Sequence, residues 1–314
     1  MEKETRRETV TEATNIVLPR RRRMRKWMLL AGVVVAVFAP IVVLFSTGTL
    51  RFHFRVGRAS SQDLLRMGDC EYVKGNYQEA KNHFRGALCR AVEMESDEDC
   101  IAAFLAIATA HEAQGEEVEA ETNLRAALFT SERTKGEDSL DTADVICRLA
   151  WLMARKRNYA EARALYRRAL DICHEALEPG DLRMVTATSN LGMVFALEGD
   201  HTAARRLFKE AIDMADMAGK SEDACLVNAW GNMASSYSDQ GMWPEAEQCL
   251  SRAIKIAESN LGENAWELGL LLKQYAHVLD AQGRKREASR ANWRARGIQA
   301  RHRDESDRLP PEGP

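Results

Sequence analysis

The sequence lacks the short motifs by which catalytic and cofactor sites are usually recognised. Its 314 residues contain no G-x-G-x-x-G fingerprint, Walker loop, H-E-x-x-H zinc motif or G-x-S-x-G nucleophile elbow. The seven histidines are isolated from one another, and no Cys/His pairs have metal-site spacing. The adjacent Cys173 and His174 would point about 100° apart on a helix and could not act as a pair. We therefore expect no enzyme activity, cofactor, metal or small-molecule substrate.

Proline is also scarce, and the chain has little net charge. Seven prolines and 45% hydrophobic residues are typical of a nearly all-helical protein, because proline interrupts helices. The net charge of −3 hides an asymmetry, since residues 1–26 hold nine Lys/Arg against four Glu. From Ala59 onward, 32 basic residues face 43 acidic ones, a net charge of −11. An acidic segment of this kind is a poor binder of nucleic acid.

What the sequence does contain is an internal repeat, and such periodicity decides the architecture. An alanine recurs at intervals of 40 and then 42 residues, as Ala80, Ala120, Ala162, Ala204, Ala246 and Ala288. A small residue precedes each, as Gly68, Ala108, Ala150, Gly192, Ala234 and Ala276. A bulky residue follows each, as Phe84, Leu124, Tyr166, Phe208 and Leu250, and is replaced by Asn292 in the last copy. Between them stands a turn glycine, as Gly75, Gly115, Gly199, Gly241 and Gly283, with Arg157 in its place in the third copy.

Each copy reads as two helices. In 191–212 an apolar stripe at helical spacing ends at Gly199, and a second stripe begins at Ala203. Neither helix can bury its stripe alone, so we expect the helices to pack on each other and on neighbouring copies. The small Gly192 and Ala204 are expected where a crossing helix comes closest, since a larger side chain would hold the backbones apart.

These residues resemble the tetratricopeptide repeat (TPR), whose pattern is W-x2-L-G-x2-Y…A-x3-F. The fourth copy reads Leu191-Gly192…Phe195…Ala204…Phe208. The period of 42 residues is longer than the usual 34 and is similar to that of kinesin light chain. The resemblance covers about 61–302 and implies an all-α fold, a right-handed superhelix of about six helix-turn-helix repeats over 61–303.

Before the repeats, residues 27–46 predict one transmembrane helix. The run from Trp27 to Phe45 is uncharged, and a helix of that length spans about 28 Å, close to the ~30 Å hydrocarbon core. Pro40 is tolerated in a membrane helix. A cleaved signal peptide is one alternative, although its apolar region is usually only ~7–15 residues. A soluble core helix is another, although no segment of the repeats is as apolar.

The remaining segments are expected as a disordered basic tail over 1–26, a juxtamembrane linker over 47–60 and a disordered tail over 304–314. Within 47–60, basic and apolar residues alternate around Phe52 and Phe54, which suits a position among lipid headgroups as well as a plain extended linker. The final helix, from Lys285, is rich in arginine, and Arg296 replaces an apolar residue of earlier copies. This substitution predicts a solvated cap on the last repeat.

The orientation in the membrane remains open. Six basic residues precede the predicted span closely and three follow it, which favours an N-terminus on the cytoplasmic or matrix side. The cysteines favour the opposite, because seven is an odd number and none has C-x-x-C spacing, as in unpaired thiols of a reducing compartment. A mitochondrial or bacterial inner membrane is the leading expectation.

The resemblance also implies a binding site, because the first helices of TPR arrays line a concave groove that holds peptides or partner helices. The positions facing this groove would be Arg148, Trp151, Arg155, Asn190, Met193, Asn228, Asn232, Ser235, Lys273, Gln274 and His277. In kinesin-light-chain-like repeats an asparagine at the position of Asn190 and Asn232 binds ligand backbone, since a carboxamide both donates and accepts. Arg148, Arg155 and Lys273 could meet acidic groups of a protein partner. The alternative is that these residues are simply exposed polar positions on one helix face.

Two functions remain compatible with these features. The first is a membrane-anchored scaffold or adaptor that binds a partner protein in its groove. The second is an assembly or maintenance factor for a membrane protein complex, resembling the membrane-anchored mitochondrial TPR proteins that attend respiratory complex III. In that case the transmembrane helix would itself contact the complex. The four glutamates among residues 1–12 argue mildly against a mitochondrial presequence.

Overall fold

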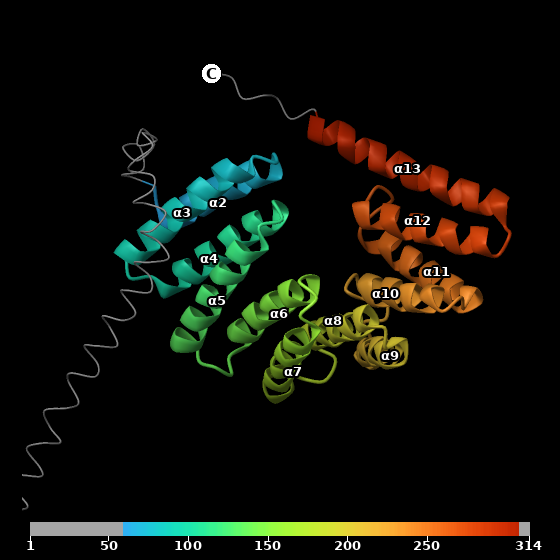
Figure 1. Ribbon diagram of the computed structural model, residues 1–314, viewed down its shortest axis with the longest axis horizontal. Helices are drawn as coiled ribbons and strands as arrows, with labels where there is room; N and C mark the ends of the chain where they lie inside the picture. The colour runs from blue at the N-terminus through green and yellow to red at the C-terminus, as the bar shows by residue number, and fades with distance from the viewer. Residues whose placement is uncertain (1–58, 308–314) are drawn as a thin grey trace, which may run out of the picture. The chain divides into compact units, whose positions relative to one another are not determined.

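The computed structural model describes residues 59–307, and their side chains as far as Arg301. This part of the chain is all-helical: twelve helices and no strand (Figure 1). The predicted basic tail, transmembrane helix and most of the linker lie outside the described residues. Within 59–307, no helix combines the length and the apolar character needed to cross a bilayer. The last helix continues to Asp307, past the predicted end of the solenoid at residue 303.

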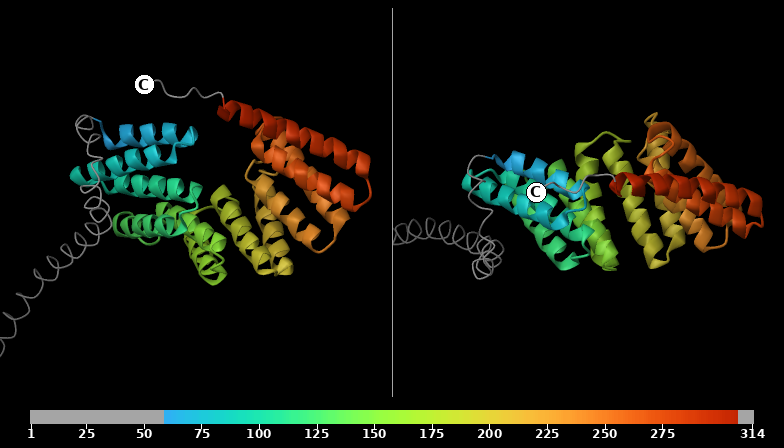
Figure 2. Two further views of the ribbon diagram at one scale, coloured as in Figure 1. Left: turned by 45° about the horizontal axis from the view of Figure 1, so that its top comes forward. Right: turned by 90° about the horizontal axis from the view of Figure 1, so that it is seen from above.

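The helices form six hairpins that follow one another in chain order, as Figures 1 and 2 show. Their bounds are α2 Ser61–Val73 and α3 Tyr77–Glu93, α4 Asp97–Ala113 and α5 Glu117–Thr134, α6 Leu140–Arg155 and α7 Tyr159–Ala176, α8 Leu182–Glu198 and α9 His201–Met217, α10 Leu226–Asp239 and α11 Trp243–Asn260, α12 Trp266–Ala281 and α13 Lys285–Asp307. Each second helix packs on the first helix of the next hairpin. The predicted superhelical stack of six repeats is therefore confirmed.

The first helices of the hairpins also approach one another directly, which makes them a continuous row. The pairs α2–α4, α6–α8, α8–α10 and α10–α12 each bring Cα atoms within 8 Å of one another. The pair α4–α6 does not, so the row is looser at this point. Side chains, rather than close backbones, must connect the second and third repeats on this face.

The repeated small and bulky residues meet in the core, as the period predicts. The six recurring alanines are buried, and so are Phe84, Leu124, Tyr166, Phe208 and Leu250. A Cβ on Gly192 would lie 2.9 Å from Phe208 Cε1 and 3.2 Å from the carbonyl oxygen of Ala204. On Gly68 it would overlap the Phe84 ring at Cε1. The prediction that small residues allow the helices to cross closely is confirmed.

The turns between helices use left-handed backbone, which glycine adopts without strain. Gly75, Gly115, Gly199, Gly241 and Gly283, the turn residues within hairpins, have φ between 71° and 89°. Two turns reach the same region without glycine, at Arg157 with φ 61° and at Glu95 with φ 53°. In the third repeat, Arg157 therefore replaces the glycine while the turn keeps the same backbone geometry.

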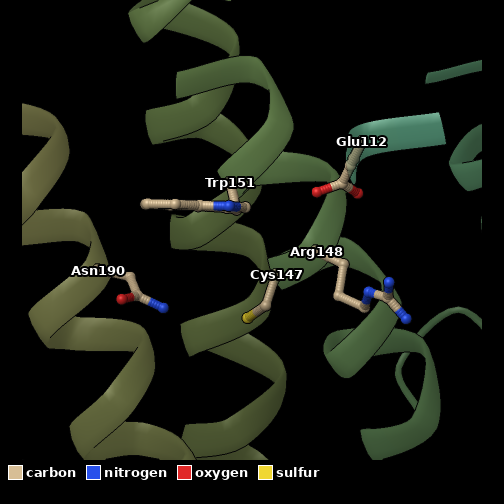
Figure 3. A pocket seen from close by; sticks show the side chains of 5 residues that line it. All are labelled: Glu112, Cys147, Arg148, Trp151 and Asn190. Carbon is tan, nitrogen blue, oxygen red and sulfur yellow. The ribbon is translucent and has the colours of Figure 1, made fainter. Parts of the chain in front are cut away.

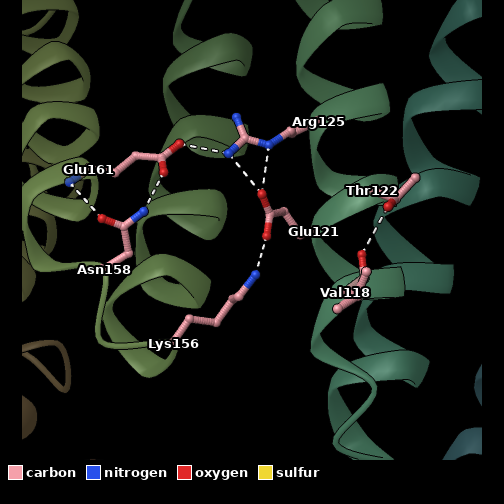
Figure 4. A network of polar contacts seen from close by, with 7 residues as sticks. All are labelled: Val118, Glu121, Thr122, Arg125, Lys156, Asn158 and Glu161. Carbon is pink, nitrogen blue, oxygen red and sulfur yellow. Dashed lines mark hydrogen bonds and ion pairs between the residues drawn. The ribbon is translucent and has the colours of Figure 1, made fainter.

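Polar side chains connect neighbouring hairpins on the side of the second helices. Figure 4 shows one such network, in which Glu121 on α5 accepts hydrogen bonds from Arg125 and from Lys156, the C-cap residue of α6. Arg125 also reaches across to Glu161 on α7, with Nη2 2.7 Å from Oε1. These ion pairs add polar specificity to contacts that are otherwise apolar.

Candidate functional site

The predicted groove residues lie on four neighbouring first helices. Arg148, Trp151 and Arg155 are on α6, Asn190 and Met193 on α8, Asn228, Asn232 and Ser235 on α10, and Lys273, Gln274 and His277 on α12. Because α6, α8, α10 and α12 contact one another in sequence, the structure brings these residues into one row. Each is either half-buried or exposed, so the row is accessible from solvent.

One end of this row is hollowed into a pocket of about 190 Å³. Three first helices line it: α4 with Glu112, α6 with Cys147, Arg148 and Trp151, and α8 with Asn190. Figure 3 shows the Trp151 indole extending from α6 toward α8, where the Asn190 carboxamide faces the same space. The Arg148 guanidinium points the other way, toward α4. The pocket therefore has an apolar and amide side at α8 and a charged side at α4.

The charged side is bonded within the chain. Arg148 Nη2 donates to Thr109 Oγ1 and, at 3.4 Å, to the carbonyl oxygen of Leu105, so this side chain spans the loose α4–α6 step. Arg155 Nη1 lies 3.6 Å from Glu112 Oε2. Burial raises the pKa of Glu112, while the charges of Arg148 and Arg155 oppose that rise. Both arginines therefore already have partners on α4, whereas the sequence analysis had expected them to be free to bind acidic groups of a ligand.

The side toward the C-terminus is different, because its carboxamides are unpaired. The side chains of Asn190, Asn232 and Gln274 form no hydrogen bond with any described residue, and they stand at 42-residue intervals. Lys273 likewise forms no ion pair within the described residues. Unpaired amides at equivalent positions on adjacent helices are available to an external ligand.

Two of the remaining predicted residues, Ser235 and His277, have local contacts. Ser235 Oγ donates to the carbonyl oxygen of Gly231 at 3.3 Å, within its own helix. The ring of His277 stands edge-on to Trp243, with 5.9 Å between centroids. The structure therefore brings Asn190, Asn232 and Gln274 together as a free set, while Ser235 and His277 are already engaged.

Two lining residues, Glu112 and Cys147, were missed by sequence reasoning. Cys147 directly precedes Arg148 in the repeat register, and Glu112 lies about one repeat before Arg155. A search for opposite charges about one repeat apart would have found Glu112 as the partner of Arg155.

The pocket offers binding groups and no reactive nucleophile. Burial raises the pKa of the Cys147 thiol to about 12, with smaller contributions from Cys173 and Asp144. The thiolate is the reactive form, so burial disfavours the reactive form of Cys147 near neutral pH. All seven cysteines lie in the described part of the chain and are unpaired. Among the described residues no group of three or more His, Cys, Asp or Glu could hold a metal ion.

Comparison with known proteins identifies the repeat. The family model described as tetratricopeptide repeat matches residues 99–173, 152–217 and 225–299. A search of curated proteins finds no match.

Solved structures share the fold at low sequence identity. BtubC (BKLC) from P. vanneervenii is 19% identical with a TM-score of 0.57, covering 78% of this chain and 94% of that one. A putative kinesin light chain with nearly identical TPR-like repeats from Podosopora anserina is 18% identical with a TM-score of 0.51, covering 64% and 96%. A Rap protein complexed with competence and sporulation factor is 16% identical with a TM-score of 0.54, covering 77% and 75%. At these identities the likeness concerns the fold alone.

Proposed function

This chain belongs to the tetratricopeptide-repeat family, and we propose that it is a membrane-tethered scaffold that binds an extended segment of a partner protein along its first helices. A Rap protein that shares this fold was solved in complex with competence and sporulation factor, which supports a binding role for the fold. The proposal assigns this chain a binding role and no catalytic step.

The observation that carries the proposal is the row of unpaired carboxamides. Asn190, Asn232 and Gln274 stand on α8, α10 and α12 at one repeat position, and their amide groups have no partner among described residues. A carboxamide can donate to a ligand carbonyl and accept from a ligand N–H at once. A row of three suits the repeating backbone groups of an extended peptide.

The pocket at Trp151 would receive one side chain of that peptide. Its indole is 40% exposed and extends over the space beside Asn190 (Figure 3). Exposed aromatic faces are common anchors in protein interfaces, because they give large contact area for little loss of side-chain freedom. Arg148 and Arg155 lie just beyond, held by α4, and would bias the ligand toward acidic groups at that end.

The tether is supported by the sequence alone. Residues 27–46 are apolar and uncharged, and a basic cluster precedes them. We place the N-terminus on the cytoplasmic or matrix side, in a mitochondrial or bacterial inner membrane.

The groove is tested by photo-crosslinking in native membranes, with a photoreactive amino acid in place of Met193. We expect a discrete crosslinked product that falls about tenfold in the Asn190→Ala/Asn232→Ala variant, while the melting temperature stays nearly unchanged. The matched control is Gln78→Ala/Gln248→Ala, which removes two exposed carboxamides from second helices and should leave the product intact. If the asparagine variant gives as much crosslinked product as the wild type, the partner does not bind through these carboxamides. If the variant unfolds, these side chains belong to the core.

Replacing residues 20–50 with an unrelated membrane span tests the role of the anchor. A scaffold should keep its crosslinked product, because the replacement still holds the array at the membrane. Loss of the product would indicate that the natural segment contacts a membrane complex, as an assembly factor would require.

A further inference from the structure

The last helix differs in charge from the rest of the array. Between residues 285 and 301, α13 carries six Lys/Arg and one Glu, whereas the chain from Ala59 onward is acidic overall. Trp293 stands in the middle of this basic helix with 79% of its surface exposed. Together with Ser289, Arg290 and Arg294, it lines a depression of about 470 Å³. One explanation for this face is that it is merely the uncapped end of the solenoid.

The repeat register shows that it is not. The positions equivalent to Trp293 in four earlier repeats are exposed and polar: Arg125, Arg167, Lys209 and Ser251. This register position therefore faces outward even where a following hairpin is present. The residues of α13 that continue the core are others, such as the buried Ala295 and Ile298. An exposed tryptophan at an outward position is not explained by the missing next repeat.

The cations around Trp293 are largely uncompensated. Arg294 pairs with Glu258 at 2.5 Å, and Arg301 donates to Asn264. In contrast, Lys285, Arg286, Arg290 and Arg296 form no ion pair within the described residues. Arg296, predicted as a solvating cap, is exposed, whereas its counterparts Leu88 and Ile212 are buried. Arg290 thus lines the depression beside the exposed indole, Arg286 and Arg296 lie two turns before and one turn after Trp293 on the same helix, and Lys285 adds a cation near the start of the helix.

We propose that this face of α13, formed by Lys285, Arg286, Arg290, Trp293 and Arg296, binds the anionic phospholipid surface of the bilayer to which the chain is tethered. The inference rests on the tether in the proposed function. Basic side chains are attracted to anionic headgroups, and tryptophan favours the membrane–water interface. Because the rest of the array is acidic, the same surface would repel it and orient the solenoid with α13 toward the lipid.

The observations favour lipid over an acidic protein segment. The exposed neighbours of Trp293 are the long, flexible cations Arg290 and Arg296 and the single hydroxyl of Ser289, and no row of unpaired amides runs across successive helices as it does in the groove. A fluid lipid surface requires no fixed geometry from such groups. Tethering also keeps the local concentration of headgroups high, so a weak contact is sufficient.

The test uses the full chain reconstituted in vesicles of phosphatidylcholine, with or without phosphatidylglycerol, containing brominated phosphatidylcholine as a quencher. The emission of Trp293 is the difference between the wild type and Trp293→Phe. We expect quenching of about twofold in the anionic vesicles, little in the neutral ones, and reversal at high salt.

Charge-removal variants identify the residues responsible. Arg286→Gln/Arg290→Gln/Arg296→Gln should abolish the quenching. The matched control, Arg167→Gln/Arg206→Gln/Lys209→Gln, removes three exposed cations from outward positions of other repeats and should preserve it. Circular dichroism should show equal helicity for both triple variants.

The outcomes separate this inference from the tether. Equal quenching in neutral and anionic vesicles, or none in either, would overturn the inference. If Trp293 is unquenched by lipid but crosslinks to a protein in native membranes, the face is a protein interface and the inference is overturned as well. Extraction of the chain from vesicles by alkaline carbonate would instead disprove the tether, whatever Trp293 does.

Discussion

Lys81 and Glu116 are 35 residues apart and bonded across the first junction between hairpins, with Nζ 2.8 Å from Oε2. The same separation recurs at the following junctions, from Glu121 to Lys156, Arg163 to Glu198 and Arg205 to Gln240. The last three pairs join the start of a second helix to the end of the next first helix, whereas Glu116 lies past the end of α4, at the N-cap of α5. The sign of the charge is reversed between the first and second junctions, so the contacts are not interchangeable.

These four polar pairs across the junctions form a ladder. The Arg163–Glu198 pair permits a direct test of its contribution to stability. Arg163 Nη1 lies 3.0 Å from Glu198 Oε2, and the guanidinium also covers the Phe195 ring at 5.4 Å. Arg163→Glu or Glu198→Arg alone should cost about 1 kcal/mol of unfolding free energy, because each creates a like-charge contact. The double reversal should recover at least part of that loss, measured by urea denaturation in a double-mutant cycle. Strictly additive losses would show that the pair does not contribute, and Arg167→Glu, at an exposed unpaired position, should cost little.

Gly192 and Phe208 are matched in size. Gly192→Ala should destabilise the protein by about 1–2 kcal/mol, because its Cβ would meet Phe208 Cε1 at 2.9 Å and the Ala204 carbonyl oxygen at 3.2 Å. Adding Phe208→Leu copies the Ala234 and Leu250 pair of the next repeat and should restore part of the stability.

The control is Gly297→Ala, since a Cβ there meets nothing within 4 Å. It should stabilise α13 slightly through helix propensity. A stabilising Gly192→Ala would contradict the close-packing argument. Thermal melting is a sufficient measurement.

Arg157 is held in left-handed backbone where its counterparts are glycine. Arg157→Gly should raise the unfolding free energy by about 0.5–1 kcal/mol, because it relieves the Cβ strain of φ 61°. The greater freedom of glycine in the unfolded chain limits the gain. Gln114→Gly, at an exposed α4 C-cap with φ −92°, should instead be destabilising. A loss of stability in the arginine variant would show that its side chain makes an unrecognised contact.

We expect His111 to make the array less stable in acid. It is buried at the position that holds Met153, Phe195, Tyr237 and Leu279 in later repeats, and its Nδ1 lies 2.5 Å from Glu116 Oε2. Burial lowers the pKa of His111 below 6.5, although the bond to Glu116 opposes this. Hydrogen bonds from Lys81 and then His111 lower the pKa of Glu116.

Because the folded pKa of His111 lies below the unfolded one, its stabilising contribution is complete above pH 6.5 and is lost as pH falls through the folded value. The drop in unfolding free energy between about pH 7.5 and about pH 5 should therefore be smaller in His111→Leu than in the wild type. His174→Leu, at an exposed site, should follow the wild type. Parallel pH profiles for all three proteins would rule out His111 as the sensor.

The sequence was sufficient for the architecture because the period fixes which residues meet. Once Ala204 and Phe208 are aligned with their counterparts, their burial follows from helical geometry. The same register placed Asn190, Asn232 and Gln274 correctly on adjacent first helices. Whether these residues bind a ligand remains a prediction.

Contacts of long side chains could not be read in this way. Arg148 bonds Thr109 across α4 and α6, which stand further apart than the other neighbouring first helices, and the repeat pattern does not encode that spacing. The partners of Arg155 were missed for the same reason. The exposure of Trp293, however, follows from its register position, since Lys209 and Ser251 already mark that position as outward.

The ladder of charges also constrains how the gene for such an array can change its copy number. Loss of the second hairpin would place Lys81 opposite Lys156, and loss of the third would place Glu121 opposite Glu198. Either deletion preserves the apolar seam and yet sets like charges face to face. Unequal recombination between copies would therefore yield arrays destabilised by like-charge contacts. The charges at the junctions thus favour the present order of the hairpins.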